Sequence, residues 1–354
     1  MSPDVVSMFR VDKTSITMYE DLSDVMSSNT RFILIFINTI IIILGLGGNG
    51  MLLYATVKQN ALKMDKMSII LVKNITVLDL LIVLLVYCPM MVTLVAERWV
   101  FGEVVCSVCA FFINNILFLQ EMIVVCILSV FRLWMLNKPR AVRESLPLYW
   151  VKVLLAVVFV FCCSFVLVFE QFDYHALYDP WSLNCWTSNY DDEDAFIFNL
   201  ILEFVFNGIP LVIIILSNSG ILFVIIRQQW KMRHNTRNTN NTAVINLLLV
   251  SWAFIFSYVP DMIVAVLDKF GNGVPDWFYV MQMYAYSLNA VINPIIYAAK
   301  DTQFRNCVND LLEVEGDSLR KLWTNFSISG DRLPNVVIEK IANLENISEN
   351  VPVQ

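Results

Sequence analysis

The last long apolar run of the chain closes on the sequence Asn-Pro-Ile-Ile-Tyr at residues 293–297. A proline inside a membrane helix leaves a backbone carbonyl without its hydrogen-bond donor. Such a break persists only where side chains or water inside the bundle satisfy the freed group. We expect Asn293, beside Pro294, to supply that polar partner. The hydroxyl of Tyr297, one turn later, can exchange hydrogen-bond partners, so the spacing predicts a helix that moves.

Two acidic residues lie inside other apolar runs, Asp79 in residues 67–95 and Glu121 in residues 104–136. A carboxylate inside a membrane is costly unless a partner or a proton neutralises it. Two acids brought into one low-dielectric site would either bind a cation such as Na⁺ or share a proton. A hydrogen-bonded polar network that only specifies packing is the open alternative.

The elements that must position these groups are membrane helices. The chain is 58% hydrophobic and 16% charged, with a mean hydropathy of +0.64, which is too apolar for an ordinary soluble domain. Runs long enough to cross about 30 Å of hydrocarbon recur along it. There are seven, and they predict an all-α membrane protein with a seven-helix bundle: 32–57, 67–95, 104–136, 147–169, 196–226, 242–267 and 276–299.

The distribution of charge orients the bundle. Lys and Arg gather in alternate loops, and the remaining loops carry only Arg98 and Lys269 of this type beside several acids. The positive-inside rule then predicts an extracellular arm over residues 1–31 and a cytoplasmic C-terminus. Residues 301–313 place Phe304, Val308, Leu311 and Leu312 on one face, which predicts a short amphipathic helix along the membrane. Residues 314–354 have the composition of a flexible tail.

The sequence offers no enzyme constellation. Its two histidines, His175 and His234, fall on opposite sides of the predicted membrane. We find no Cys/His spacing for a metal, no glycine-rich phosphate loop and no nucleophile paired with a base. We therefore expect neither catalysis nor a cofactor, apart from Na⁺ as an allosteric ion, and no nucleic-acid partner.

Several short motifs follow one another along the chain: Gly48-Asn49, Asn74 with Leu78-Asp79, Trp99 to Gly102 before Cys106, Arg132 with Pro139, Pro210, Phe254 with Pro260, Asn293-Pro294 to Tyr297, and Phe304. Their order and spacing resemble those of the rhodopsin-like (class A) G-protein-coupled receptors. The resemblance covers residues 32–313, and it implies a seven-transmembrane receptor domain with an eighth helix.

The chain departs from the family at several positions. Tyr258 replaces the usual sixth-span tryptophan, and Asn218 replaces the fifth-span tyrosine. The interval from Cys106 to Arg132 is one residue longer than usual, which predicts a bulge or a shifted register. Phe131 stands where an acid normally pairs with Arg132, and Asn240 stands near a second such position. We therefore expect raised basal signalling.

The resemblance also groups the polar residues. Counted back from Arg132, Glu121 faces the level of Asp79, where the family usually has a serine. The amides that would complete this cation or proton site are Asn49, Asn289 and Asn293. At the outer face, the resemblance implies a disulfide between Cys106 and Cys185, with Cys109 one turn deeper as a competing partner.

The same resemblance places a ligand pocket in the outer half of the bundle. Its acids are Glu203, two turns above Pro210, and Asp261, which follows Pro260. The other lining residues are Asn114, Asn207, Tyr258, Gln282 and Tyr286. We hypothesise a cationic ligand, an amine or a basic peptide, held by Glu203 or Asp261. The alternative is that these acids only satisfy Tyr, Asn or water near the pocket mouth.

The function implied is that of a plasma-membrane receptor for signal transduction. An extracellular ligand would move the sixth helix about Pro260, rearrange Asn293, Pro294 and Tyr297, and open a cleft at Arg132 for a heterotrimeric G protein. An ion- or proton-coupled transporter-like protein and a non-signalling receptor-like scaffold are the alternatives. Residues 276–299 contain no lysine to hold a light-sensing chromophore, which argues against an opsin.

Overall fold

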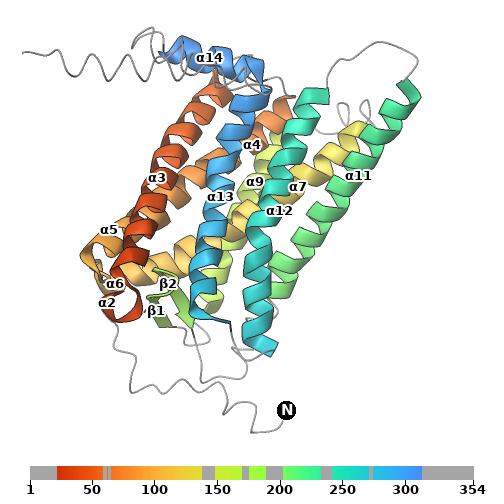
Figure 1. Ribbon diagram of the computed structural model, residues 1–354. Helices are drawn as coiled ribbons and strands as arrows, with labels where there is room; N and C mark the ends of the chain where they lie inside the picture. The colour runs from red at the N-terminus through yellow and green to blue at the C-terminus, as the bar shows by residue number, and fades with distance from the viewer. Residues whose placement is uncertain are drawn as a thin grey trace, which may run out of the picture.

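The computed structural model describes residues 22–58, 62, 65–137, 148–169, 175–188, 202–232, 241–270 and 274–312. Seven helical columns form a bundle, and some columns contain more than one element (Figure 1). In chain order the columns are α3 (Ser28–Val57); α4 (Lys66–Ile82), η1 (Val83–Tyr87) and α5 (Cys88–Ala96); α6 (Gly102–Ser107), η2 (Val108–Leu117) and α7 (Phe118–Asn137); α9 (Leu148–Phe169); η4 (Leu202–Gly208) and α11 (Ile209–Met232); α12 (Asn241–Phe270); and α13 (Asp276–Lys300).

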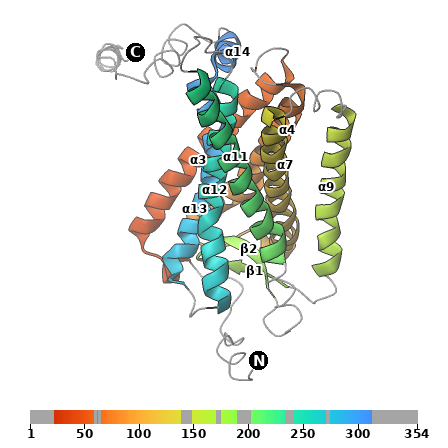
Figure 2. The same cartoon turned by 90° about the vertical axis from the view of Figure 1, so that its right-hand side faces the viewer.

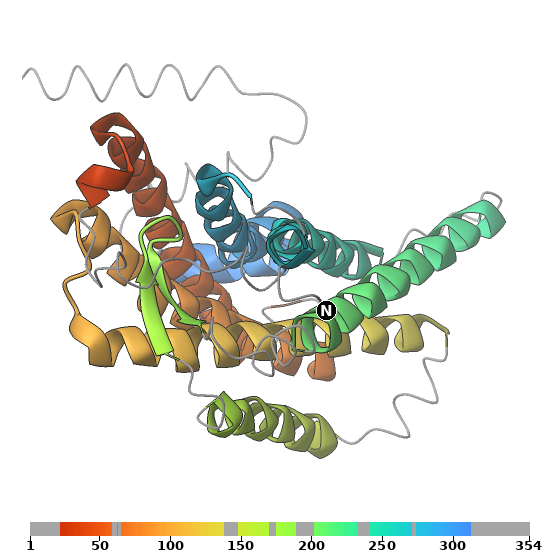
Figure 3. The same cartoon turned by 90° about the horizontal axis from the view of Figure 1, so that it is seen from below.

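Three smaller features mark the two ends of the bundle. Helix α14 (Thr302–Leu312) lies across one end, which we call the α14 end. Strands β1 (His175–Asp179) and β2 (Asn184–Ser188) form a hairpin at the opposite hairpin end, where the short helix α2 (Leu22–Val25) also lies. Figure 2 shows α9 at the edge of the bundle, and Figure 3 shows the hairpin in front of the helices when seen from its own end.

The columns have the apolar character that a membrane requires. Among the described residues, the segments long and apolar enough to cross it are Ser28–Val57, Lys66–Ala96, Phe118–Asn137 and Phe204–Arg227. Shorter apolar stretches lie in the third, fourth and sixth columns, at Gly102–Phe111, Tyr149–Ser164 and Leu248–Val264. Large apolar side chains face outward, with Phe32 64% exposed and Phe256 68% exposed, as lipid contact demands. The predicted all-α seven-helix fold is confirmed.

Local sequence explains where several helices begin. Ser27 caps α3, because its Oγ accepts a hydrogen bond of 3.2 Å from the backbone N–H of Thr30. Asp65 caps α4, and its carboxylate accepts from the backbone N–H of Ser68 at 2.9 Å and from the Ser68 hydroxyl at 2.5 Å. These caps fix the ends of two columns whose interiors carry the polar core.

Three of the columns contain π-helical segments. Segment η1 ends two residues before Pro89, and η4 ends two residues before Pro210. Proline has no N–H and clashes with the carbonyl four residues earlier, so a wider turn accommodates it. Segment η2 lies between Cys106 and Arg132, where the sequence is one residue longer than the family pattern. The predicted bulge is therefore present as a π-helical stretch.

The hairpin is tied to the third column by the disulfide between Cys106 and Cys185. The strands are antiparallel, with Tyr178 opposite Cys185. The Tyr178 ring stacks on Trp99 with ring centroids 5.5 Å apart. Cys109 is buried with a free thiol, so the predicted pairing is confirmed and the competing partner is not used.

Helix α14 packs by its apolar face. Phe304 and Val308 are 1% and 0% exposed, while Leu311 is 39% exposed. Asp301 caps the helix by accepting from the backbone N–H groups of Gln303 and Phe304, and Lys58 at the end of α3 pairs with Asp310 at 3.0 Å. The predicted short amphipathic helix is present. The predicted tail, 314–354, lies outside the described residues, as do Pro139 and Asn240.

Candidate functional site

The break in α13 is satisfied by a different residue from the one expected. Pro294 leaves the carbonyl of Ala290, four residues earlier, without an intrahelical donor. Asn49 on α3 donates its Nδ2 to that carbonyl at 2.6 Å, and to the Gly45 carbonyl at 3.0 Å. The expectation that Asn293 fills this role is wrong, because the Asn293 amide is turned toward the acidic core.

The two acids meet in the centre of the bundle, as predicted. Asp79 is 0% exposed and Glu121 is 2% exposed, and their carboxyl groups are close enough to interact electrostatically. Asn293 Nδ2 donates to Asp79 Oδ2 at 3.0 Å, and Asn289 Nδ2 donates to Glu121 Oε1. The site thus joins α4, α7 and α13 through one polar cluster.

Aromatic rings cover this cluster on the side of the hairpin end. Tyr258 stacks on Phe254 with centroids 4.2 Å apart and meets Tyr286 edge-on at 4.8 Å. Tyr286 in turn packs on Phe118 at 5.0 Å. The Tyr258 hydroxyl interacts electrostatically with both Glu121 and Asp261. The tyrosine that replaces the family tryptophan therefore connects the acidic core to the predicted ligand pocket.

The structure brings together some of the residues that were predicted to bind a ligand. Gln282 Nε2 donates a hydrogen bond to Asp261 Oδ1, which joins α13 to α12 one turn from the paired rings. Asp261 is half-buried and Gln282 is 8% exposed. Asn207 is half-buried on η4. Glu203 lies on η4 and Asn114 on η2, but their side chains lie outside the described part of the chain.

Arg132 lies near the end of α7 that is at the α14 end of the bundle. It is 8% exposed and interacts electrostatically with Tyr297 and with Asp65, the cap of α4. Sequence reasoning missed Asp65. The spacing of Asp65, three residues before Ser68 at the start of a helix, indicates a helix cap. That spacing does not indicate that Asp65 lies near Arg132.

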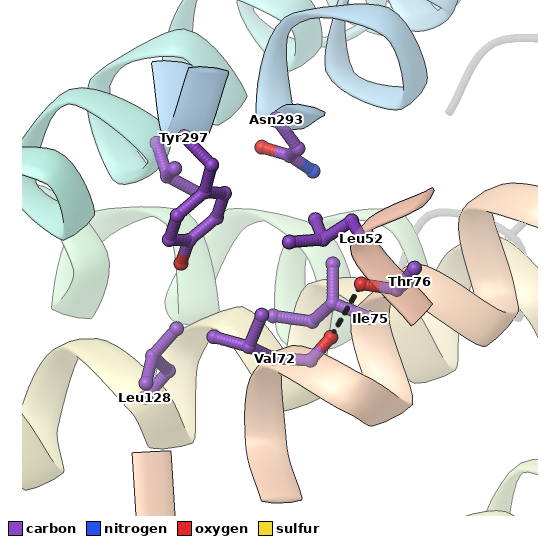
Figure 4. Close-up of a pocket in the computed structure, with 8 residues that line it drawn as sticks. Leu52, Val72, Ile75, Thr76, Leu128, Asn293 and Tyr297 are labelled. Carbon is purple, nitrogen blue, oxygen red and sulfur yellow. Dashed lines mark hydrogen bonds between the residues drawn. The ribbon is translucent and has the colours of Figure 1, made fainter. Parts of the chain in front are cut away.

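A small cavity lies beside the Asn293–Tyr297 segment of α13. Its volume is about 10 Å³, and its lining residues are Leu52, Val72, Ile75, Thr76, Leu128, Val250, Asn293 and Tyr297. Figure 4 shows Asn293 and Tyr297 at one side of this space and the apolar side chains of α4 and α7 at the other. The volume matches roughly one water molecule. Tyr297 also packs on Phe304 of α14, with centroids 6.3 Å apart, so its neighbours belong to several elements.

The cluster is not a conventional metal site. Within the described ranges, no group of three or more His, Cys, Asp or Glu could hold a metal ion. Two carboxyl groups, buried amides and a tyrosine hydroxyl can bind a small cation or a proton and can exchange hydrogen bonds. Among the described residues of this cluster, no nucleophile is paired with a base.

The seven-column fold, the disulfide-anchored hairpin and the polar core define the class of protein. The sequence model described as 7 transmembrane receptor (rhodopsin family) matches residues 48–297 of the 354, and the chain belongs to this family. It is accordingly a multi-pass membrane receptor of the plasma membrane and not an enzyme.

Known proteins similar to this chain agree with that class. The rhodopsin of Sminthopsis crassicaudata is 24% identical over an alignment of 291 residues, and the match covers 76% of this chain and 78% of that protein. Proteinase-activated receptor 2 of Homo sapiens is 20% identical over an alignment of 322 residues, and the match covers 87% of this chain and 77% of that protein. The crystal structure of squid rhodopsin has a TM-score of 0.67 at 17% identity, covers 87% of this chain and 88% of its own, and therefore shows the shared fold.

Proposed function

We propose that the protein binds an extracellular ligand at the hairpin end and activates a heterotrimeric G protein at the α14 end. The orientation rests on charge, since the loops that would face the cytoplasm hold most of the Lys and Arg between the spans. A disulfide at the hairpin end suits an oxidising exterior. The N-terminus would then be outside and the C-terminus in the cytoplasm.

The ligand is a cation, either an amine or a peptide with a basic residue. The observation that carries this proposal is the carboxyl group of Asp261, half-buried and held by Gln282. Tyr258 and Tyr286, one turn away, offer ring faces and edges of the kind that surround organic cations. Glu203, on the neighbouring fifth column, would be the second acid of the pocket.

Signalling would run from this pocket to Arg132. A ligand that favours one position of α12 about Pro260 also changes the contacts of Tyr258, which faces Glu121. The Asn293–Pro294 break lets the end of α13 with Tyr297 change partners, and Arg132 then faces the G protein.

The test is a screen of amines and basic peptides against cells that express the full chain, read with sensors for several G proteins. For the best agonist, Asp261→Asn together with Glu203→Gln should weaken potency by about 10- to 100-fold, since a charged hydrogen bond is lost. Glu97→Gln is a matched control, because Glu97 is a partly exposed acid at the hairpin end that pairs with Arg31 at 2.6 Å.

Three outcomes would contradict the proposal. Unchanged potency in the double variant excludes the acid-held cation. Ligand-independent ion currents or solute uptake favour a transporter-like protein. Absence of any G-protein response, with Arg132→Ala also without effect, favours a scaffold that does not signal.

A further inference from the structure

The acidic core has an arrangement that differs from a cation site. Asp79 and Glu121 are both buried, and Asn293 and Asn289, one turn apart on α13, each donate to one of them, so the two carboxyl groups share one enclosed site. Two ionised carboxylates repel strongly in such a low-dielectric interior, so the arrangement is stable only if the pair shares a proton. A bound cation would instead separate the two groups and take their oxygens as its ligands.

The amides around the pair are oriented for the same role. Asn289 and Asn293 each turn their Nδ2 donor toward a carboxyl oxygen. Their Oδ1 atoms, which a cation would use, are buried and find no protein partner among the described residues. Two N–H donors and one shared proton suit a pair that carries a single negative charge. Hard metal ions need oxygen ligands, and N–H donors instead direct positively polarised hydrogens into the site.

Among the residues that the structure describes, the groups that interact with the pair do not supply a compensating positive charge. They are Tyr87 from η1 and Tyr258 from α12, with amides from α13. A tyrosine is neutral or anionic, so neither of these two can balance a second carboxylate. Arg132 lies eleven residues beyond Glu121 on α7, which is about 16 Å along a helix.

We propose that Asp79 and Glu121 form a proton-binding site, with one proton shared between their carboxyl groups, in place of a bound sodium ion. Glu121 is the residue that makes this possible, because a hydroxyl at its position could not share the charge. Proton release would leave two neighbouring carboxylates that repel each other and would drive α4 and α7 apart. Each carboxylate would then accept more strongly from Asn289 or Asn293 and pull on α13 next to Pro294, so the protonation state acts on the segment that we expect to move.

The proposal is tested on the purified full chain in lipid nanodiscs, with no ligand or G protein, so its outcome is separate from that of the proposed function. Thermal unfolding is followed from about pH 6 to about pH 9, in sodium chloride and in N-methylglucamine chloride of equal ionic strength. The folded pair holds a proton that the separated carboxyls of the unfolded chain release by neutral pH, so stability falls as the pH rises. We expect Tm to fall by about 2–4 °C across this range, equally in both salts.

Infrared spectroscopy supplies an independent reading. The wild-type chain should show the carbonyl stretch of a protonated, buried carboxylic acid, and Glu121→Gln should lose both this band and the pH dependence of Tm. The amide that this substitution introduces keeps the shape of the side chain and a hydrogen-bond donor, so we expect the variant to fold.

Matched variants sharpen the result. Asp310→Asn, at an exposed acid on α14, should retain the band and the pH dependence. Glu121→Ser should lose the band and become stabilised by sodium, since Asp79 alone is then left ionised. If Glu121→Gln does not fold, Asp79→Asn serves as the second one-carboxyl variant. A wild-type Tm that rises with sodium, or a wild-type chain without the protonated-carboxyl band, overturns the proposal.

Discussion

Asn49 on the first column donates a 2.6 Å hydrogen bond to the carbonyl of Ala290 on the seventh, the carbonyl that Pro294 leaves without a donor. The two residues are 241 positions apart in the chain. Both are nearly inaccessible, with Asn49 0% and Ala290 2% exposed. The break at Pro294 is thus held by a neighbouring helix, and the segment of α13 that we expect to move begins at a point fixed to α3.

Removing the Asn49 donor should show how much the break at Pro294 lowers the free energy of unfolding. We expect Asn49→Ala to lower the free energy of unfolding by about 1–2 kcal/mol, because a buried carbonyl loses its donor. In a Pro294→Ala background the helix regains its own N–H donor to Ala290, so the same change should cost less. A thermal-unfolding double-mutant cycle measures the difference. Strictly additive effects would mean that the Asn49 bond does not compensate for the proline.

Gly48 lies against the ring of Pro294, which explains the small residue beside Asn49. A Cβ at Gly48 would lie 2.7 Å from Pro294 Cγ and 2.9 Å from its Cβ, and a proline ring cannot turn aside. We expect Gly48→Ala to destabilise the bundle by about 1–3 kcal/mol through overpacking. Gly47→Ala and Gly50→Ala are matched controls, since a Cβ at either position meets nothing within 4 Å. Equal Tm values for all three variants would contradict this packing role.

Much of the architecture could be predicted from the chain itself. The length of the apolar runs predicted the helical columns. The order of the motifs predicted the disulfide and placed Asp79 and Glu121 at the same depth in the bundle. The donor to Ala290 could not be predicted, because a backbone carbonyl has no residue type to mark it. The interaction of Asp65 with Arg132 could not be predicted either, because it depends on tertiary packing. The local sequence indicates only that Asp65 caps a helix, and the packing of α4 beside α7 brings it near the arginine.

Asp65 should restrain Arg132 in place of the acid that Phe131 replaces. Asp65→Asn keeps a good capping side chain but removes the charge. An interaction of about 1 kcal/mol between the two groups corresponds to a roughly fivefold shift in the resting equilibrium. We therefore expect basal G-protein signalling to rise by about 2- to 5-fold, measured with the sensor assay at matched surface expression.

The exposed acid Asp310, changed to Asn, is the control for this experiment and should leave basal signalling unchanged. A wild-type chain with no basal signal above that of mock-transfected cells would contradict the expected raised activity. An Asp65→Asn variant at the wild-type level would show that Asp65 does not restrain Arg132.

Asp179 gives the hairpin a dependence on pH. Burial raises the pKa of this carboxyl above its ordinary value of 3.8, with nearby Asp276 also raising it, against hydrogen bonds from Ser182 and Trp181 that lower it. The folded hairpin therefore binds a proton more tightly than the unfolded segment. Its stability should rise as the pH falls from neutral through the raised pKa, and this gain is absent above that pKa.

Hydrogen exchange of residues 175–188, corrected for intrinsic rates, measures this effect. Protection should increase as the pH falls from neutral through the raised pKa of Asp179, and Asp179→Asn should remove the change. Asp276→Asn should move it to lower pH, because one source of the raised pKa is gone. Protection that falls on acidification would contradict the assignment.

The three π-helical segments have a consequence for comparing this receptor with its relatives. Each lies in the half of its column nearer the hairpin, where the predicted ligand-binding residues lie. A π turn holds an extra residue, so side chains beyond it are rotated relative to an uninterrupted helix. Where the helix of a relative is uninterrupted, position-by-position alignment without gaps would remain valid near Arg132 and Tyr297 but would assign the wrong side chains to the ligand. Ligand preferences should be inferred for this chain from spatial superposition rather than from aligned letters.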